Sequence, residues 1–253
     1  MAIPSTDYSA LLSGSMLIRE YGAAAPSLSV GNVSALTLSP QEDVKSLQDF
    51  TQPGGNKRAE VRRLTGVDFS FTFTDYSAEN FARGLRADID TIAAGTASAE
   101  QVVAYKGGYV GLSKIAATIT SVEPVGGGTP FVSPGDYELR DGQLYIPSGS
   151  TIAAVTGGAA NIEVDYTFAA QKNVEALVKS NQQYEVMFVG LNEARSGKAV
   201  RVCLHKVSGG VLQEMALIGD DFLSGQVNGS LLPDSSKAGG GTDSAYFTVE
   251  IVD

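Results

Sequence analysis

Hydrophobic and polar residues alternate along several short segments of the chain, with a period of two residues rather than 3.6. Between positions 67 and 74, valine and phenylalanine occupy every second position, and aspartate, serine and threonine fill the positions between them. Successive side chains of a strand point to opposite faces, so this pattern predicts a strand with one buried face. Other strands are predicted at 15–20, 33–38, 101–105, 184–189, 200–205, 211–218, 226–232 and 247–251. The chain is therefore expected to be mainly β and antiparallel.

One helix is predicted directly after the clearest strand. Ser77 is a favourable N-cap, and Glu79 places negative charge in the first turn. Phe81, Leu85, Ile89 and Ile92 then recur at spacings of three and four residues before Gly95. This stripe is typical of a helix that packs against a sheet, and the pattern predicts that it continues as far as Ile92.

The composition changes between about residues 120 and 168. A run of three glycines begins at Gly126, and the turn dipeptide Asp141-Gly142 separates two short alternating runs, which predicts a β-hairpin. This stretch holds six acidic residues and one basic residue, half of the formal net charge of -10. We expect it to be a small inserted β-module.

Composition excludes several classes of function. With one cysteine and one histidine in 253 residues, the chain cannot form an intramolecular disulfide or a Cys/His zinc cluster. Its 28 acidic and 18 basic residues argue against tight binding to a phosphate backbone. No apolar run approaches the ~18 residues that span a bilayer, and residues 1–19 lack the pattern of a secretory signal. The sequence therefore predicts a soluble cytoplasmic product with no membrane partner.

The residues that could carry chemistry do not form a recognisable active site. Cys203 and His205 share one face of a predicted strand, but neighbours on a strand project side by side and no third residue orients them. The segment 190–199 resembles a phosphate-binding loop only loosely, because its glycine spacing is too long and Ala199 replaces the hydroxyl residue. Four acids of the insertion could include a glycosidase pair, although their spacing singles out no pair: Glu123, Asp136, Glu138 and Asp141. We predict no enzyme activity, no cofactor and no metal site.

A charged segment divides into an acidic and a basic half around the turn Pro53-Gly54-Gly55. The residues that suggest this division are Glu42, Asp43, Asp49, Lys57, Arg58, Arg62 and Arg63. The segment is either a solvated loop or an electrostatic contact between copies of the protein, in which acids of one copy face bases of its neighbour.

The order of these segments resembles that of the tail tube protein (major tail protein) of long-tailed bacteriophages. The resemblance covers roughly residues 10–112 and 166–253, and each of its motifs is weak when taken alone. The matching segments are the turn Val30-Gly31-Asn32-Val33, a long charged loop at 41–65, the helix start at 75–81, the strands at 184–192 and 200–207, and a final strand at 244–252.

The resemblance implies a fold and an assembly. The fold would be two packed antiparallel sheets, a β-sandwich or barrel-like structure with one flanking α-helix. Residues 1–112 and 169–253 would form this tail-tube domain, and residues 113–168 the inserted β-module. Six copies would close into a ring, and the rings would stack into a hollow tube through which DNA leaves the capsid.

The resemblance also implies partners and a location. The partners would be other copies of the chain, a tape-measure protein, a tail terminator and tail-tip or baseplate proteins. The protein would be assembled in the host cytoplasm and would reside in the virion tail. DNA would pass through the bore without specific binding, since a bore lined with Lys and Arg would retain phosphate groups.

One alternative belongs to a different class of protein. A β-sandwich adhesion or carbohydrate-binding module would place its binding face on the acidic insertion. Exposed aromatic side chains would then gather there, and Phe131, Tyr137 and Tyr145 are candidates.

Overall fold

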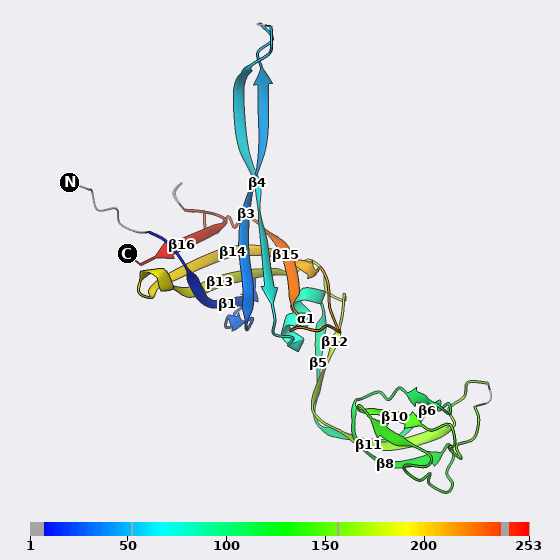
Figure 1. The fold of residues 1–253 in the computed structure, drawn as a ribbon. Coiled ribbons are helices and arrows are strands. Elements are labelled where there is room, and N and C mark those ends of the chain that lie inside the picture. The colour runs from blue at the N-terminus through cyan, green and yellow to red at the C-terminus, as the bar shows by residue number, and fades with distance from the viewer. Residues whose placement is uncertain (1–7, 52, 156, 239–242, 253) are drawn as a thin grey trace. The chain divides into compact units, whose positions relative to one another are not determined.

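The protein is mainly antiparallel β-structure with one flanking α-helix, as the sequence predicts (Figure 1). The computed structural model describes residues 8–51, 53–155, 157–238 and 243–252. The chain divides into two compact units. Unit 1 comprises Met1–Ile89 and Val174–Asp253, and unit 2 comprises Asp90–Asn173.

Unit 1 is built on one hydrogen-bonded sheet in the order β2-β1-β13-β14-β15-β4-β3, with β16 also paired to β14. Its elements are β1 (Leu12–Glu20), β2 (Leu28–Ser29), β3 (Val33–Gln48), β4 (Lys57–Phe73), α1 (Ala78–Leu85), β13 (Gln183–Asn192), the 3-10 turn η1 (Glu193–Arg195), β14 (Lys198–Leu212), β15 (Gly225–Leu231) and β16 (Phe247–Ile251).

The long strand β14 turns this sheet into two packed layers. Its first half, Val200–Leu204, pairs with β16, and its second half, Val207–Leu212, pairs with β15 across a register shift. Only glycine fits at Gly210 in this shift, because a Cβ atom there would overlap the backbone oxygen of Asn228. β15, β4 and β3 thereby pack over β1, β13 and β14, and the core lies between the two layers.

The predicted strand at 67–75 is the centre of that core. Val67, Phe69, Phe71 and Phe73 are all buried on one face of β4. The rings of successive phenylalanines lie 5.5 Å and 6.1 Å apart between centroids. Alternation along the chain therefore identified the buried face correctly.

The helix starts where predicted and ends earlier. Ser77 caps α1 by accepting a hydrogen bond from the backbone N–H of Asn80, but the helix stops at Leu85, where Arg86 adopts a left-handed conformation. The prediction that it continues to Ile92 was wrong. Ile89 and Ile92 lie in strand β5 (Asp88–Ile92), which pairs with β12 (Gln171–Glu175).

Unit 2 has its own core between two three-stranded sheets, β7-β10-β9 and β6-β11-β8. The predicted hairpin is present, and both Asp141 and Gly142 have the positive φ that a tight two-residue turn requires. The strands are β6 (Gly95–Val102), β7 (Gly108–Val110), β8 (Ala116–Pro124), β9 (Glu138–Arg140), β10 (Gln143–Ile146) and β11 (Ile162–Phe168).

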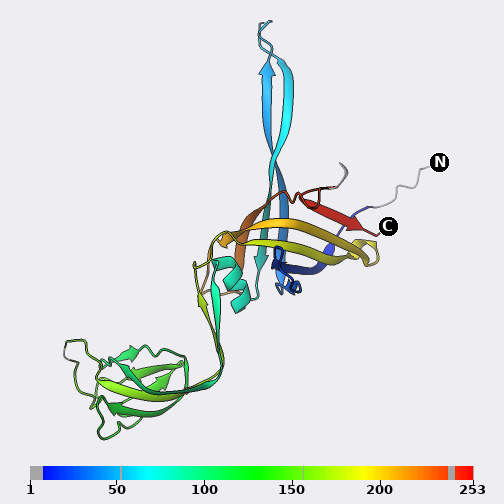
Figure 2. The ribbon, with the colours of Figure 1, turned by 180° about the vertical axis from the view of Figure 1, so that it is seen from behind.

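Unit 2 spans more of the sequence, Asp90–Asn173, than the insertion expected at 113–168. β6 and β7, which the sequence analysis assigned to the main domain at 1–112, pair with β11 and β10 of unit 2. At the two crossings between the units, β5 and β12 form a two-stranded ladder (Figure 2).

Candidate assembly interface

The charged segment at 41–65 is a β-hairpin, and its assignment as a long loop was wrong. β3 and β4 stay paired from Gln41–Gly66 out to Gln48–Lys57. β15 pairs with β4 only from Val67 to Phe73, so the outer half of the hairpin has no third strand among the described residues. We call residues 41–65 the arm, and Figure 1 shows it extending away from the rest of unit 1.

Acids and bases of the arm form ion pairs along each strand and, in one case, between β3 and β4. Arg62 donates to the Oε1 atom of Glu60 over 2.6 Å and lies 3.2 Å from the Oε2 atom of Glu42. Lys57 also pairs with Glu60, and Lys45 lies 3.2 Å from Asp43. Most opposite charges of the arm are therefore matched within one hairpin.

Three of the seven predicted residues stand outside these pairs. Asp49 lies in the turn, where the hydroxyl and then the backbone N–H of Thr51 lower the pKa of its carboxyl by hydrogen bonding. Arg58 and Arg63 have no carboxylate within ion-pair distance in the part of the chain that the structure describes. Among the described residues these two guanidinium groups are the cations of the arm without an ion pair, and Arg63 lies directly opposite Asp43 in the β3–β4 ladder.

Sequence reasoning overlooked Glu60 and Lys45 as members of this network. Glu60 lies inside the basic run, two residues from Arg62, and residues two apart on a strand share a face. Recognition of the segment as a strand would have placed Glu60 beside Arg62.

The arm also exposes aliphatic and aromatic side chains on both of its faces. Val44 and Leu64 share one face with Arg62, and Leu47 and Val61 share the other with Arg63. Phe50 in the turn is 83% exposed. A two-stranded hairpin with no buried face is marginally stable in water, and exposed apolar groups of this kind mark contact surfaces.

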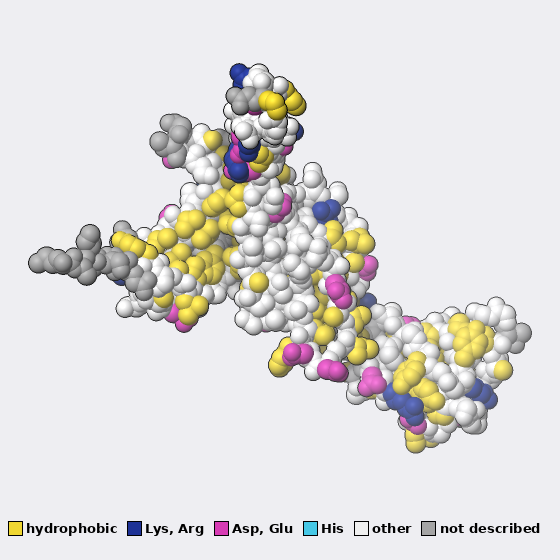
Figure 3. Space-filling model, turned by 45° about the horizontal axis from the view of Figure 1, so that its top comes forward, with side chains coloured by type: hydrophobic (Ala, Val, Ile, Leu, Met, Phe, Trp, Pro, Cys, Tyr) yellow, Lys and Arg dark blue, Asp and Glu magenta, His cyan; other side chains and the backbone are white. Residues whose placement is uncertain are grey.

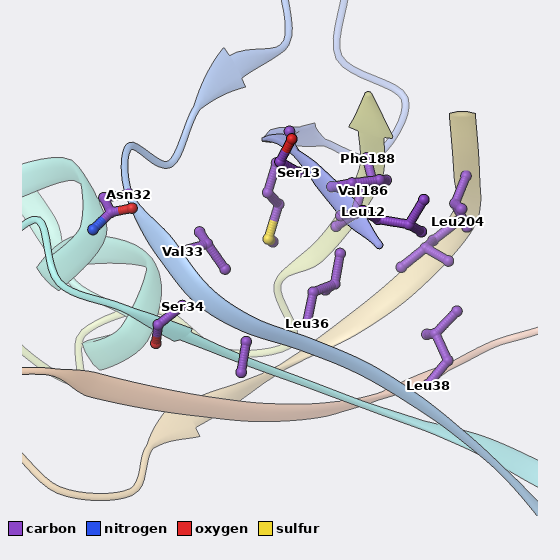
Figure 4. A pocket seen from close by; sticks show the side chains of 14 residues that line it. Leu12, Ser13, Asn32, Val33, Ser34, Leu36, Leu38, Val186, Phe188 and Leu204 are labelled. Atoms are coloured by element: carbon purple, nitrogen blue, oxygen red, sulfur yellow. The ribbon is translucent and has the colours of Figure 1, made fainter. Parts of the chain in front are cut away.

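A second apolar surface lies where the two layers of unit 1 remain open. A cleft of about 560 Å³ separates the edges of β1 and β3, and its walls include Met16, Leu36, Phe188 and Leu204 (Figure 4). No titratable side chain lines it. Hydrophobic side chains gather on this side of unit 1 beside the base of the arm (Figure 3). The cleft has the character of a packing surface, with Ser13, Asn32 and Ser34 among its polar lining residues.

Neither the Cys203 and His205 pair nor the loosely phosphate-loop-like segment 190–199 has the surroundings that its proposed chemistry would need. Cys203 and His205 line a shallow depression on β14, beside the cross-strand pairs Arg19–Glu185 and Arg201–Glu250. The segment 190–199 joins β13 to β14 as a hairpin containing η1, so it does not lead into a helix as a phosphate loop does.

Asp136 and Glu138 of unit 2 make local contacts. Asp136 accepts hydrogen bonds from the backbone N–H groups of Thr151 and Val132, and these lower the pKa of its carboxyl. Glu138 pairs with Arg140 over 2.7 Å. The lowered pKa of Asp136 is the opposite of the raised pKa expected of a glycosidase acid.

Among the described residues, no group of three or more His, Cys, Asp or Glu side chains could hold a metal ion. Within the same residues, the helices are too short or too polar to cross a membrane.

The chain belongs to a protein family described as "Protein of unknown function UCP028589", whose family model matches residues 9–250. That match includes the arm and both units. No curated protein matches the chain.

Proposed function

We propose that this protein is a structural subunit that assembles into stacked hexameric rings, forming the tail tube of a long-tailed bacteriophage. The observation that carries the proposal is the arm, a hairpin with unpaired edges and exposed apolar side chains on both faces. Such a hairpin would be stabilised by contact with other copies of the chain. The hexamer and the tube come from the resemblance in sequence order.

The open cleft between β1 and β3 supports the same proposal. Unpaired strand edges next to apolar side chains invite pairing with another chain, and closure into a ring would cover them. An enzyme would instead be expected to place titratable groups in a cleft of this size.

The proposed tube conducts DNA without binding it. Phosphate groups lie one per ~1.7 Å of the duplex axis, so a basic bore would retain the genome through many contacts. We expect the residues that line the bore to be neutral or acidic, in keeping with the net charge of -5 that remains when the -5 of residues 120–168 is subtracted from the total of -10. A ring of Lys or Arg side chains around the bore would contradict this part of the proposal.

The proposed partners are the tape-measure protein, the tail terminator and the tail-tip or baseplate proteins, and the proposed location is the virion tail after assembly in the host cytoplasm. These partners and this location are inferred from the resemblance alone, so they hold only if the resemblance reflects a real relationship.

Negative-stain electron microscopy of the purified protein across a concentration series tests the proposal. The expected result is hollow rings or tubes of uniform width that become more abundant with concentration. Addition of a tail-tip complex as initiator distinguishes a subunit that awaits nucleation from one that does not assemble. A monomer under both conditions would refute the proposal.

One observation favours the carbohydrate-binding alternative. Tyr109 is 60% exposed, its ring lies 5.1 Å from that of Tyr145, and the guanidinium of Arg140 stacks 3.8 Å from the Tyr145 ring centroid. These groups share the outer face of the β7-β10-β9 sheet. The Arg140 stack already occupies one face of Tyr145, so we rank this alternative second. If the protein bound glycans on an array and Tyr109→Ala abolished that binding, the carbohydrate-binding alternative would rank first.

A further inference from the structure

The connection between β14 and β15 is a second surface with unmatched charge and exposed apolar groups. We call residues 213–224 the acidic loop. It contains Glu214, Asp220 and Asp221 and no basic residue. Ile218 and Phe222 are each 95% exposed. Large side chains this exposed mark a site of contact with another molecule.

The acidic loop complements the arm in charge. The arm retains two cations without a carboxylate partner in the described residues, Arg58 and Arg63, next to exposed Leu47 and Val61. The loop carries two adjacent acids beside an exposed isoleucine and phenylalanine. Each surface therefore offers the charge that the other lacks, together with apolar area to bury.

The register of β4 places these surfaces at opposite ends of one strand. Gly225, which follows the acidic loop, pairs with Phe73 at the end of β4. Arg63 lies ten positions earlier on the same strand, about 33 Å away at the usual rise per residue. Arg58 lies further out along the arm. The arm of one copy therefore extends away from its own acidic loop.

We propose that the acidic loop is the docking site for the arm of a second copy. Asp220 and Asp221 face Arg58 and Arg63 of that copy, and Ile218 and Phe222 pack against its exposed aliphatic side chains. A contact between opposite ends of identical subunits is head-to-tail, and it repeats without limit along one direction. This inference rests on the proposed function and identifies the surface that would receive the arm during stacking.

The open cleft of unit 1 is a weaker acceptor for the arm. Its lining combines apolar side chains with Ser13, Asn32 and Ser34 and includes no carboxylate. Docking there would leave Arg58 and Arg63 without partners next to a low-dielectric surface, which is unfavourable.

A charge exchange tests the pairing directly. The variants are Arg58→Glu/Arg63→Glu, Asp220→Arg/Asp221→Arg, and the combination of all four substitutions. Each double variant is expected to raise the concentration needed for assembly by about tenfold or more, because it replaces attraction with repulsion. The combined variant restores complementary charges and should return to within about threefold of the original protein. Assembly is measured by light scattering and electron microscopy, and circular dichroism verifies folding.

The matched control is Lys106→Glu/Lys114→Glu, which changes the charge by the same amount within unit 2. It should assemble like the original protein. The pairing would be refuted if the combined variant assembled no better than the two double variants, or if Asp220→Arg/Asp221→Arg had no effect.

Disulfide cross-linking supplies a second readout that does not depend on charge. In a Cys203→Ser background, Arg63→Cys together with Asp220→Cys should yield a ladder of covalent oligomers on oxidation, since a disulfide forms only between close Cα atoms. Each cysteine alone should yield no ladder.

The outcomes separate the two proposals. Tubes without cross-links and without charge rescue would reject the docking site and leave the proposed function intact. Failure of the original protein to assemble under any condition would reject both.

Discussion

At the scale of single residues, the carboxylate of Glu100 organises one end of unit 2. Its Oε2 atom accepts hydrogen bonds from the hydroxyls of Tyr166, over 2.6 Å, and Ser113, over 2.8 Å. Its Oε1 atom accepts the backbone N–H of Ser113 over 2.7 Å. Burial alone would raise the pKa of Glu100, but these hydrogen bonds outweigh it and lower the pKa. Tyr166 is fully buried, so its hydroxyl depends on these partners.

Glu100→Gln should therefore destabilise unit 2 in a pH-dependent way. Because the folded-state pKa of Glu100 lies below the unfolded value, the ionised carboxylate stabilises the fold above the unfolded pKa, and this stabilisation is lost as the pH falls through the folded pKa. The expected loss is about 1 kcal/mol at neutral pH, since Glu100 is partly exposed. Urea unfolding of both proteins from about pH 7 to about pH 3 should show the difference shrinking. A difference independent of pH would show that ionisation is not involved.

At the scale of elements, α1 depends on its ends and on tertiary contacts. The helix has eight residues, which is too short to be stable by itself. The side-chain amide of its buried Asn80 donates to the backbone oxygens of Val30 and Asp75, both over 2.8 Å. Gly84 lets the helix approach β14 closely, because a Cβ atom there would lie 3.3 Å from that of Leu212.

Removal of the cap should weaken this element measurably. Ser77→Ala deletes the oxygen that accepts the N–H of Asn80 and should lower the stability of unit 1 by about 1 kcal/mol. Ser77→Asp is the control, since aspartate caps helices equally well and should retain most of the stability. Chemical denaturation followed by circular dichroism measures both. Equal losses in the two variants would show that the cap does not determine stability.

At the scale of the whole molecule, the chain contains two separate hydrophobic cores. One is centred on Phe69, Phe71 and Phe73 in unit 1, and the other on Val164 and Tyr166 in unit 2. No residue belongs to both clusters. Each unit is therefore expected to unfold as its own cooperative transition.

Core substitutions should then act on one transition at a time. Phe71→Ala should destabilise unit 1 by about 3–5 kcal/mol, and Val164→Ala should destabilise unit 2 by a smaller amount. Differential scanning calorimetry should show two transitions, each variant lowering the midpoint of a different one. A single transition that both variants shift equally would mean that the units unfold together.

Local pattern in the sequence determined much of the fold. Alternation identified the buried face of 67–73, Ser77 identified the start of α1, and Asp141-Gly142 identified a hairpin. Each signal lies within a few neighbouring residues, where side-chain direction, capping and turn conformation follow from local chemistry. The scarcity of histidine and cysteine likewise limited the possible chemistry, because one residue of each type cannot build a Cys/His metal cluster.

Tertiary structure decided what local pattern could not. Ile89 and Ile92 have helical spacing but lie in a strand, because β12, about eighty residues later, pairs with β5. The seven predicted charged residues near 41–65 were found as a group, but only the pairing of β3 with β4 brought Arg62 to Glu42 and placed Arg63 opposite Asp43. Strand pairing depends on residues that are distant in the chain, so its register is decided only when the sheets assemble. The extent of unit 2 and the placement of the acidic loop at the opposite end of β4 from the arm follow from that pairing.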